Sequence, residues 1–151
     1  MTRLSMFALV AVLAVSATAG VAAGASSPSS PAKIGARNTK LGKVLVNGKS
    51  VTLYLFMKDK KGKSACSGAC AQAWPPLLTK GRPQASGGTS AAKLGTTRRS
   101  DGTTQVTYNG HPLYTFVLDH GKPGSTAGEG SKAFGAEWYV LGTNGNKIDK
   151  S

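Results

Sequence analysis

The sequence predicts a mainly β protein: a single small domain of two pseudo-symmetric hairpin repeats with a short helical turn. Residues 45–59 and 106–119 share one pattern, Asn-Gly followed by Leu-Tyr-x-Phe-x-x-Asp. A tryptophan follows each copy, at Trp74 and Trp138. Short apolar runs separated by glycine turns favour strands. A repeat at this spacing predicts two similar supersecondary units that pack on each other.

The N-terminal residues 1–25 have the features of a cleaved secretory signal peptide. Arg3 supplies a positive start, residues 7–15 form an apolar run too short to span a bilayer, and small residues follow. An uncleaved anchor is the alternative. We therefore expect a secreted or extracytoplasmic protein of the cell envelope. Residues 26–40 are rich in Ser, Pro and Ala without periodicity, which predicts a flexible linker.

The expected tandem-repeat domain covers residues 41–151, with repeat one at about 41–78. Asn47-Gly48 between apolar segments predicts a hairpin, because both residues tolerate positive φ. The strand at 50–57 has apolar residues on both faces and should be central to the core. Residues 64–74 favour a short helical turn that ends at the following Pro-Pro.

Repeat two is expected at about residues 94–148. A hairpin around Asp101-Gly102 should open it, and Asn109-Gly110 should form another tight turn. The strand equivalent to the first central one is then expected at 113–118. A glycine-rich loop and a final strand should follow, at 120–131 and 137–141 respectively.

The chain is strongly basic, with 19 Lys and Arg against 6 Asp and Glu and a formal net charge of +13. Such a charge favours anionic partners, but on its own it argues about association and not about a site. We expect an anionic cell-wall polymer or an envelope protein as partner, with peripheral membrane contact as a further option. No specific nucleic-acid recognition is expected. The plainer alternative is solubility with loose attraction.

Cys66 and Cys70 are the only cysteines, and in an oxidising compartment two thiols usually pair. A disulfide between them would close a very short loop and mainly fix a local turn. Catalytic or metal-bound thiols are the alternative.

The motif residues are Tyr54, Phe56, Asp59, Tyr114, Phe116 and Asp119. The two Asp residues could share a cation or ligand contact where the repeats meet, although a calcium cage needs more oxygen ligands than this chain offers. Alternatively, each Asp caps the turn that follows it, at 60–62 or 120–121.

The tyrosines and tryptophans are expected to anchor the core. The expected core is Leu53, Tyr54, Phe56, Trp74, Leu113, Tyr114, Phe116, Trp138 and Val140.

His111 and His120 are weak metal candidates, because their spacing with the cysteines is not a standard zinc pattern. Tyr54 and Tyr114 could relay electrons, but no cofactor is indicated.

There is no Gly-x-Ser-x-Gly and no phosphate-loop context around Gly124 to Gly130. We therefore expect no enzymatic activity and no catalytic residue.

The paired motifs resemble the bacterial secreted-repeat lipoproteins, predicted envelope proteins with a Tyr-x-(Phe/Trp/Tyr)-x-x-Asp motif. The segment from Cys66 to Leu77, which reads Cys-Ser-Gly-Ala-Cys-Ala-x-x-Trp-Pro-Pro-Leu, and the segment from Phe134 to Val140 strengthen the resemblance. The resemblance implies export and tandem repeats, and no activity. The chain lacks the lipid-anchor cysteine near the expected cleavage region. We expect an exported, non-enzymatic binding or scaffold module, with an accessory role in envelope redox or metal handling as the alternative.

Overall fold

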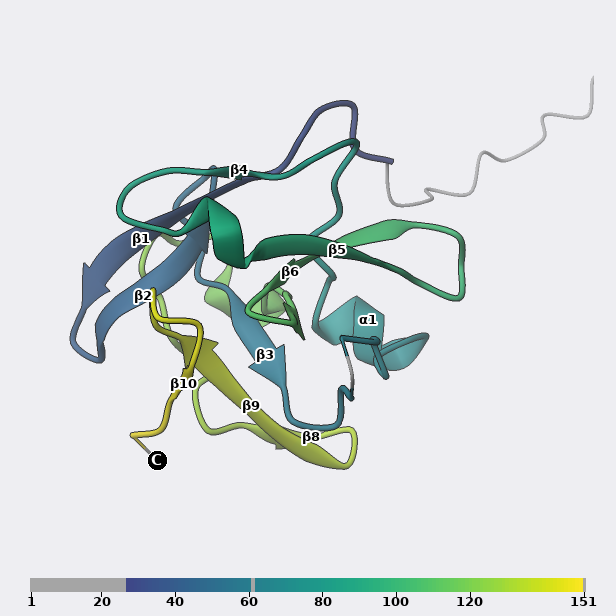
Figure 1. Cartoon of the computed structure of the whole chain (residues 1–151). Helices are drawn as coiled ribbons and strands as arrows, with labels where there is room; N and C mark the ends of the chain where they lie inside the picture. Colours follow the sequence, from purple (N-terminus) through teal and green to yellow (C-terminus); the bar gives the residue numbers. More distant parts are fainter. Residues whose placement is uncertain (1–26, 61, 151) are drawn as a thin grey trace, which may run out of the picture.

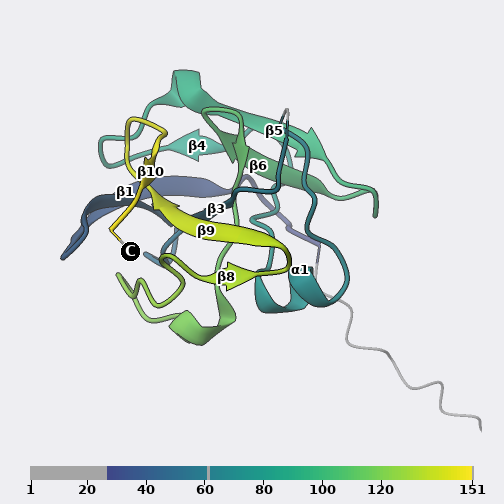
Figure 2. The same cartoon turned by 90° about the horizontal axis from the view of Figure 1, so that it is seen from below.

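A computed structural model describes residues 27–60 and 62–150, so the expected signal peptide at 1–25 lies outside the described residues. Short strands form three small sheets, ordered β2-β1-β4, β10-β9-β3 with β8 beside β9, and β5-β6-β7 (Figures 1 and 2). The elements are β1 (Lys33–Thr39), β2 (Gly42–Asn47), β3 (Tyr54–Phe56), α1 (Ala69–Ala73), β4 (Gln84–Ala85), η1 (Ala91–Lys93), β5 (Leu94–Arg98), β6 (Thr104–Tyr108), β7 (His111–Pro112), η2 (Val117–Asp119), β8 (Lys132–Ala133), β9 (Ala136–Leu141) and β10 (Lys147–Ile148). The mainly β prediction is confirmed.

Each repeat opens with an antiparallel hairpin, β1–β2 in the first and β5–β6 in the second. The first hairpin corrects the expected flexible linker at 26–40, because β1 occupies residues 33–39 of it. Only Ile34 in this strand is buried, so the sequence gives a weak hydrophobic signal. Residues 34–39 pair with β2, and residues 33–34 pair with β4 on the other edge of the strand, so β1 is held by backbone hydrogen bonds that composition did not indicate.

The two Asn-Gly turns differ. In the second copy Asn109 and Gly110 both have positive φ, 50° and 80°, as a tight hairpin turn requires. In the first copy the positive φ of 62° falls instead on Ser50, whose backbone N–H donates to the Asn47 carbonyl at 2.9 Å. The Asn47 side chain accepts the N–H of Lys49, which stabilises this turn. The hairpin is present, but the expected role of Gly48 is wrong.

The expected second central strand at 113–118 is also wrong. The strand β7 ends at Pro112, and residues 117–119 form the 3-10 helix η2. The Thr115 N–H bonds to the carbonyl of Pro75, and beyond this point the chain coils so that Asp119 turns inward. The strand was predicted from an apolar run that includes Val117 and Leu118. These side chains are 44% and 58% exposed, so they do not belong to a core-facing strand.

The repeats interlock through their tyrosine segments. Tyr54 and Tyr114 exchange backbone hydrogen bonds of 2.8 and 3.0 Å. Strand β3 of the first repeat pairs with β9 of the second, where Phe56 faces Trp138. In return, Tyr114 forms a bridge with Pro76 of the first repeat. Each tyrosine segment therefore lies beside the segment that follows the tryptophan of the other repeat.

Apolar side chains fill both faces of the central strands, as expected for the segment at 50–57. Leu53 and Leu55 face one core, while Tyr54 and Phe56 face the other. The short helical turn is confirmed as α1, which Pro75 and the next proline follow. The expected core residues are buried, except that Phe116 is half-buried. Within the described residues no helix has the length and apolarity to span a bilayer.

Candidate functional site

Four aromatic rings form a stacked column at the junction of the repeats. Its order is Phe56, Trp138, Trp74 and Phe116, with 4.0 Å between the centroids of each neighbouring pair. The two indoles are nearly parallel, at 5°. The sequence predicted one tryptophan anchor for each repeat, whereas the structure joins both in a single core. The column therefore couples the packing of one repeat to that of the other.

The two motif tyrosines flank the column edge-on and reach across it. Tyr54 meets Trp74 at a ring-centroid distance of 5.4 Å, and Tyr114 meets Trp138 at 5.1 Å. The Tyr54 hydroxyl donates to Asp119 Oδ2 at 2.7 Å. The Tyr114 hydroxyl donates to Asp59 Oδ2 at 2.8 Å. Each tyrosine of one repeat is thus paired with the aspartate of the other.

The second carboxylate oxygen of each aspartate holds the loop that follows it. Asp119 Oδ1 accepts the Ser125 hydroxyl at 2.7 Å and the Ala127 N–H at 3.0 Å. Asp59 Oδ1 accepts the Ala65 N–H at 2.6 Å. The donors thus lie farther along the chain than the expected turns at 60–62 and 120–121. A carboxylate that accepts such bonds keeps its loop in one conformation.

Both aspartates that could have shared a cation accept hydrogen bonds from protein donors instead. Asp59 and Asp119 sit in different tyrosine pairs. No three His, Cys, Asp or Glu side chains gather into a metal-binding group within residues 27–60 and 62–150. His111 lies in β7 and is half-buried, and burial lowers its pKa. His120 is exposed at the end of η2, with a positive φ of 50°.

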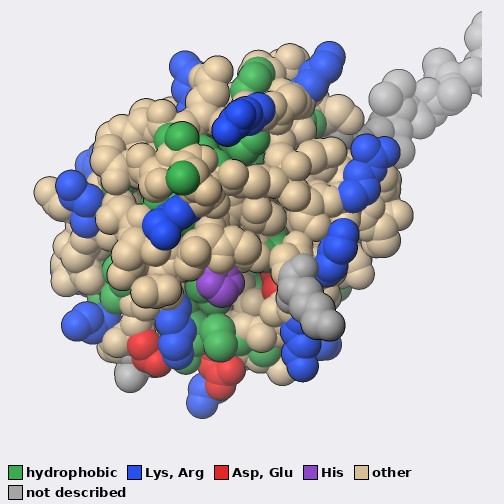
Figure 3. Space-filling view, in the orientation of Figure 1, with side chains coloured by type: hydrophobic (Ala, Val, Ile, Leu, Met, Phe, Trp, Pro, Cys, Tyr) green, Lys and Arg blue, Asp and Glu red, His purple; other side chains and the backbone are tan. Residues whose placement is uncertain are grey.

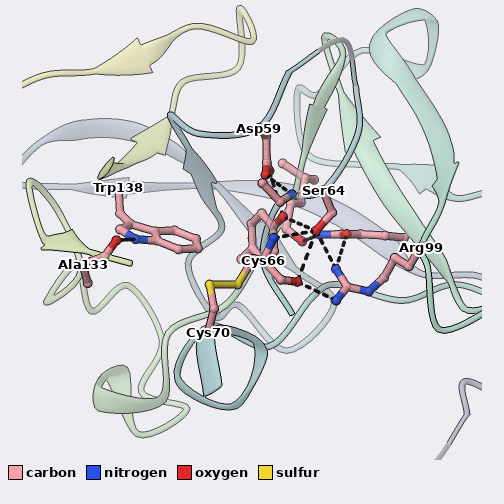
Figure 4. The surroundings of a disulfide bond; sticks show 11 residues. Asp59, Ser64, Cys66, Cys70, Arg99, Ala133 and Trp138 are labelled. Atoms are coloured by element: carbon pink, nitrogen blue, oxygen red, sulfur yellow. Dashed lines mark hydrogen bonds between the residues drawn. A yellow bond between two sulfur atoms is a disulfide. The ribbon is translucent and has the colours of Figure 1, made fainter. Parts of the chain in front are cut away.

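Sequence reasoning missed Arg99, which anchors the disulfide loop from the β5–β6 hairpin. Its guanidinium donates to Ser64 Oγ at 2.8 Å, to Gln105 Oε1 at 2.9 Å and to the Cys66 carbonyl at 2.7 Å (Figure 4). The Arg99 side chain is only 5% exposed. Arg99 has no distinctive sequence signal, because two of its partners, Ser64 and Cys66, lie more than thirty positions away along the chain.

The predicted disulfide joins Cys66 to Cys70. Cys66 is 1% exposed and Cys70 is 6% exposed, and both pack in the core that contains Trp74 and Trp138. In the view of Figure 4 the bond lies between the Trp138 indole and the Arg99 side chain. The bond thus closes a short loop against the aromatic column.

The disulfide should resist mild thiols in the folded protein, because a reductant cannot reach buried sulfur without local opening. We expect no free thiol after exposure to glutathione in native buffer, and complete reaction once denaturant is added. Thiol titration with a chromogenic disulfide measures both. Rapid reduction in native buffer would contradict this expectation and would favour the redox alternative.

The Cys66→Ser/Cys70→Ser variant should lose about 2 kcal/mol of stability, since the closed loop is short.

Burial governs the ionisation of this site. It raises the pKa of both tyrosine hydroxyls well above the ordinary phenol range, and the neighbouring carboxylates raise it further. The phenols are therefore protonated donors at any physiological pH. Burial also raises the pKa of Asp59, although the Ala65 N–H and the Tyr114 hydroxyl act against it. The site holds hydrogen-bonded carboxylates, neutral phenols and an oxidised cysteine pair, an arrangement that fixes loop geometry.

The raised pKa of Asp59 predicts a pH dependence of stability. The folded carboxyl binds its proton more tightly than the unfolded chain, where an Asp has a pKa of about 4. Its contribution to stability is therefore complete below that value and is lost as pH rises through the raised pKa. As the pH rises from about 3 to about 7, the urea concentration at the midpoint of unfolding should fall for the wild type relative to that of Asp59→Asn.

This comparison isolates one group. The pKa of Glu129 is also raised by burial, but that residue is present in both proteins and cancels in the difference. A wild-type midpoint that rises relative to the variant with increasing pH would show that the paired, ionised form of Asp59 is the favoured one.

A family model described as a secreted repeat of unknown function matches residues 35–78 and 95–141. The two matched segments begin inside β1 and β5, so the matched units start with the two hairpins. Each contains one Tyr-x-Phe-x-x-Asp copy and one tryptophan of the column. No curated protein and no solved structure matches the chain.

Proposed function

Since this chain belongs to the family of secreted repeats of unknown function, we propose its role from its surface: an exported, non-enzymatic module that binds an anionic polymer of the cell envelope. The interlocked repeats supply a rigid scaffold, and the exposed lysines and arginines supply the attraction. An envelope protein with an acidic surface would be recognised by the same charges.

The observation that carries the proposal is uncompensated positive charge. Lysine and arginine side chains are spread over the face in Figure 3, while acidic side chains are few. Within the described part of the chain, the ion pairs are Arg99–Asp101 and Lys147–Asp149. Most of the basic side chains therefore remain available to a partner.

Several of the carboxylates are occupied by internal contacts. Asp59 and Asp119 accept the tyrosine hydroxyls, and Glu129 accepts the backbone N–H of Val140 at 2.8 Å. Such groups cannot neutralise distant surface lysines at physiological ionic strength, where the Debye length is about 8 Å. The field outside the protein is therefore positive and attracts polyanions.

Retention on isolated envelope material tests this proposal. The protein should bind at about 0.05 M salt and dissociate as the salt approaches about 0.5 M, because screening weakens contacts between exposed charges. Exposed lysines on the loop after β3 offer a matched comparison. Lys58→Gln/Lys60→Gln/Lys63→Gln should elute at lower salt than the wild type, whereas the corresponding Lys→Arg variant should elute with it. Retention that is unchanged at high salt would overturn the proposal.

A further inference from the structure

A polar hollow lies between the β1–β2 hairpin and the loop that follows η2. Its volume is about 370 Å³. Lys40 and Lys122 line it, together with residues 123–127, and it is open to solvent. The two lysines are far apart in the sequence, and the fold brings them to one hollow. We call it the Lys40–Lys122 hollow.

A third cation lies against the same loop. A Cβ atom built on Gly124 would be 3.0 Å from Arg37 Nε and 3.3 Å from Arg37 Cδ. The absence of a side chain at Gly124 therefore lets the arginine pack on the loop backbone. Gly124 also has a positive φ of 73°, which glycine adopts without strain. None of the residues that line the hollow is acidic.

Asp119, the last residue of the second Tyr-x-Phe-x-x-Asp copy, holds the loop that lines the hollow. Asp119 is 1% exposed, and its carboxylate accepts the Ser125 hydroxyl and the Ala127 N–H. The Gly124 N–H also donates to the carbonyl of Ser50 at 3.2 Å. A loop fixed in this way need not be ordered when a ligand binds, so less of the binding free energy is lost.

We propose that the Lys40–Lys122 hollow binds one phosphodiester group of a phosphate-linked envelope polymer. This inference rests on the proposed function and assigns it a site and a ligand chemistry. The ammonium groups of Lys40 and Lys122 line the hollow, and ammonium groups serve as point charges for phosphate. Because the hollow is open, a polymer chain can enter and leave it, which an enclosed pocket would prevent. Converging cations raise the local concentration of the anion.

The test is a titration of the full secreted protein with a synthetic poly(glycerol phosphate) oligomer, followed by ¹H–¹⁵N NMR. The amide signals of Lys40, Gly124 and Thr126 should shift first. Lys40→Gln/Lys122→Gln should bind about tenfold more weakly, the order expected for two lost charge-assisted contacts. Lys80→Gln/Lys132→Gln removes the same charge from exposed positions outside the hollow and should weaken binding about twofold or less. Retention of binding by Lys40→Arg/Lys122→Arg would show that charge at these positions is what matters.

The outcomes separate this inference from the proposed function. Equal losses in the two Lys→Gln pairs would overturn the hollow as a site, while salt-sensitive envelope retention could still hold. A poly-glutamate of the same charge that shifts the same signals with equal affinity would overturn the phosphodiester assignment. Envelope retention that is insensitive to salt would overturn the proposed function, whatever the oligomer does.

Discussion

Neither half of this protein should fold alone, although the two halves should fold when they are mixed. A cut between Gly87 and Gly88 gives an N-terminal fragment that ends at residue 87 and a C-terminal fragment of residues 88–151, each with one motif copy and one tryptophan. Separation would remove every hydrogen bond between β3 and β9 and leave both strand edges unpaired. It would also break every stacked contact of the aromatic column, because its rings alternate between the two fragments. A fragment with a small core and open edges is rarely stable in water.

Circular dichroism in the near ultraviolet and NMR dispersion measure this directly. Each fragment should give the spectrum of an unfolded chain, and an equimolar mixture should recover the spectrum of the intact protein. Complementation should be lost when one fragment carries Trp138→Ala, because that substitution removes a ring from the shared column. A dispersed spectrum from either fragment alone would show that the repeats are independent units that merely pack together.

The repeat, the strand-rich composition and the local turns could be predicted because they depend on neighbouring residues. The β5–β6 hairpin lies where its pattern placed it, and so do the helical turn α1 and the strand β9. Strand β1 could not be predicted in the same way. Its sequence, Lys-Ile-Gly-Ala-Arg-Asn-Thr, has a single buried position, and its order comes from β2 and β4 on its two edges.

The motif residues could be identified from the sequence, but not their partners. Alternation along a strand shows which face Tyr54 occupies, yet not which aspartate its hydroxyl reaches. That partner, Asp119, comes from the other repeat because the two tyrosine segments pair across the junction. Arg99 and the Lys40–Lys122 hollow were not predicted for the same reason. Each is assembled from segments that only the tertiary structure brings together.

Replacement of a column tryptophan should cause the largest loss of stability of any single side-chain truncation in this domain. Trp138 is completely buried, stacks on Phe56 and Trp74, and donates its indole N–H to the Ala133 carbonyl at 3.1 Å. Trp138→Ala should lower the free energy of unfolding by about 3–5 kcal/mol. Small domains typically have only about 5–15 kcal/mol in total, so this loss would be a large fraction of the stability of the domain.

Chemical denaturation followed by circular dichroism measures the loss, and two variants set its scale. Trp138→Phe keeps a ring in the column and should lose less than Trp138→Ala. Leu118→Ala truncates a large apolar side chain that is 58% exposed and should change stability by about 0.5 kcal/mol or less. Trp74→Ala and Trp138→Ala remove opposite sides of one contact, so their losses should not add in the double variant. Additive losses would mean that the two indoles stabilise their own repeats separately, and the column would then not be the element that joins them.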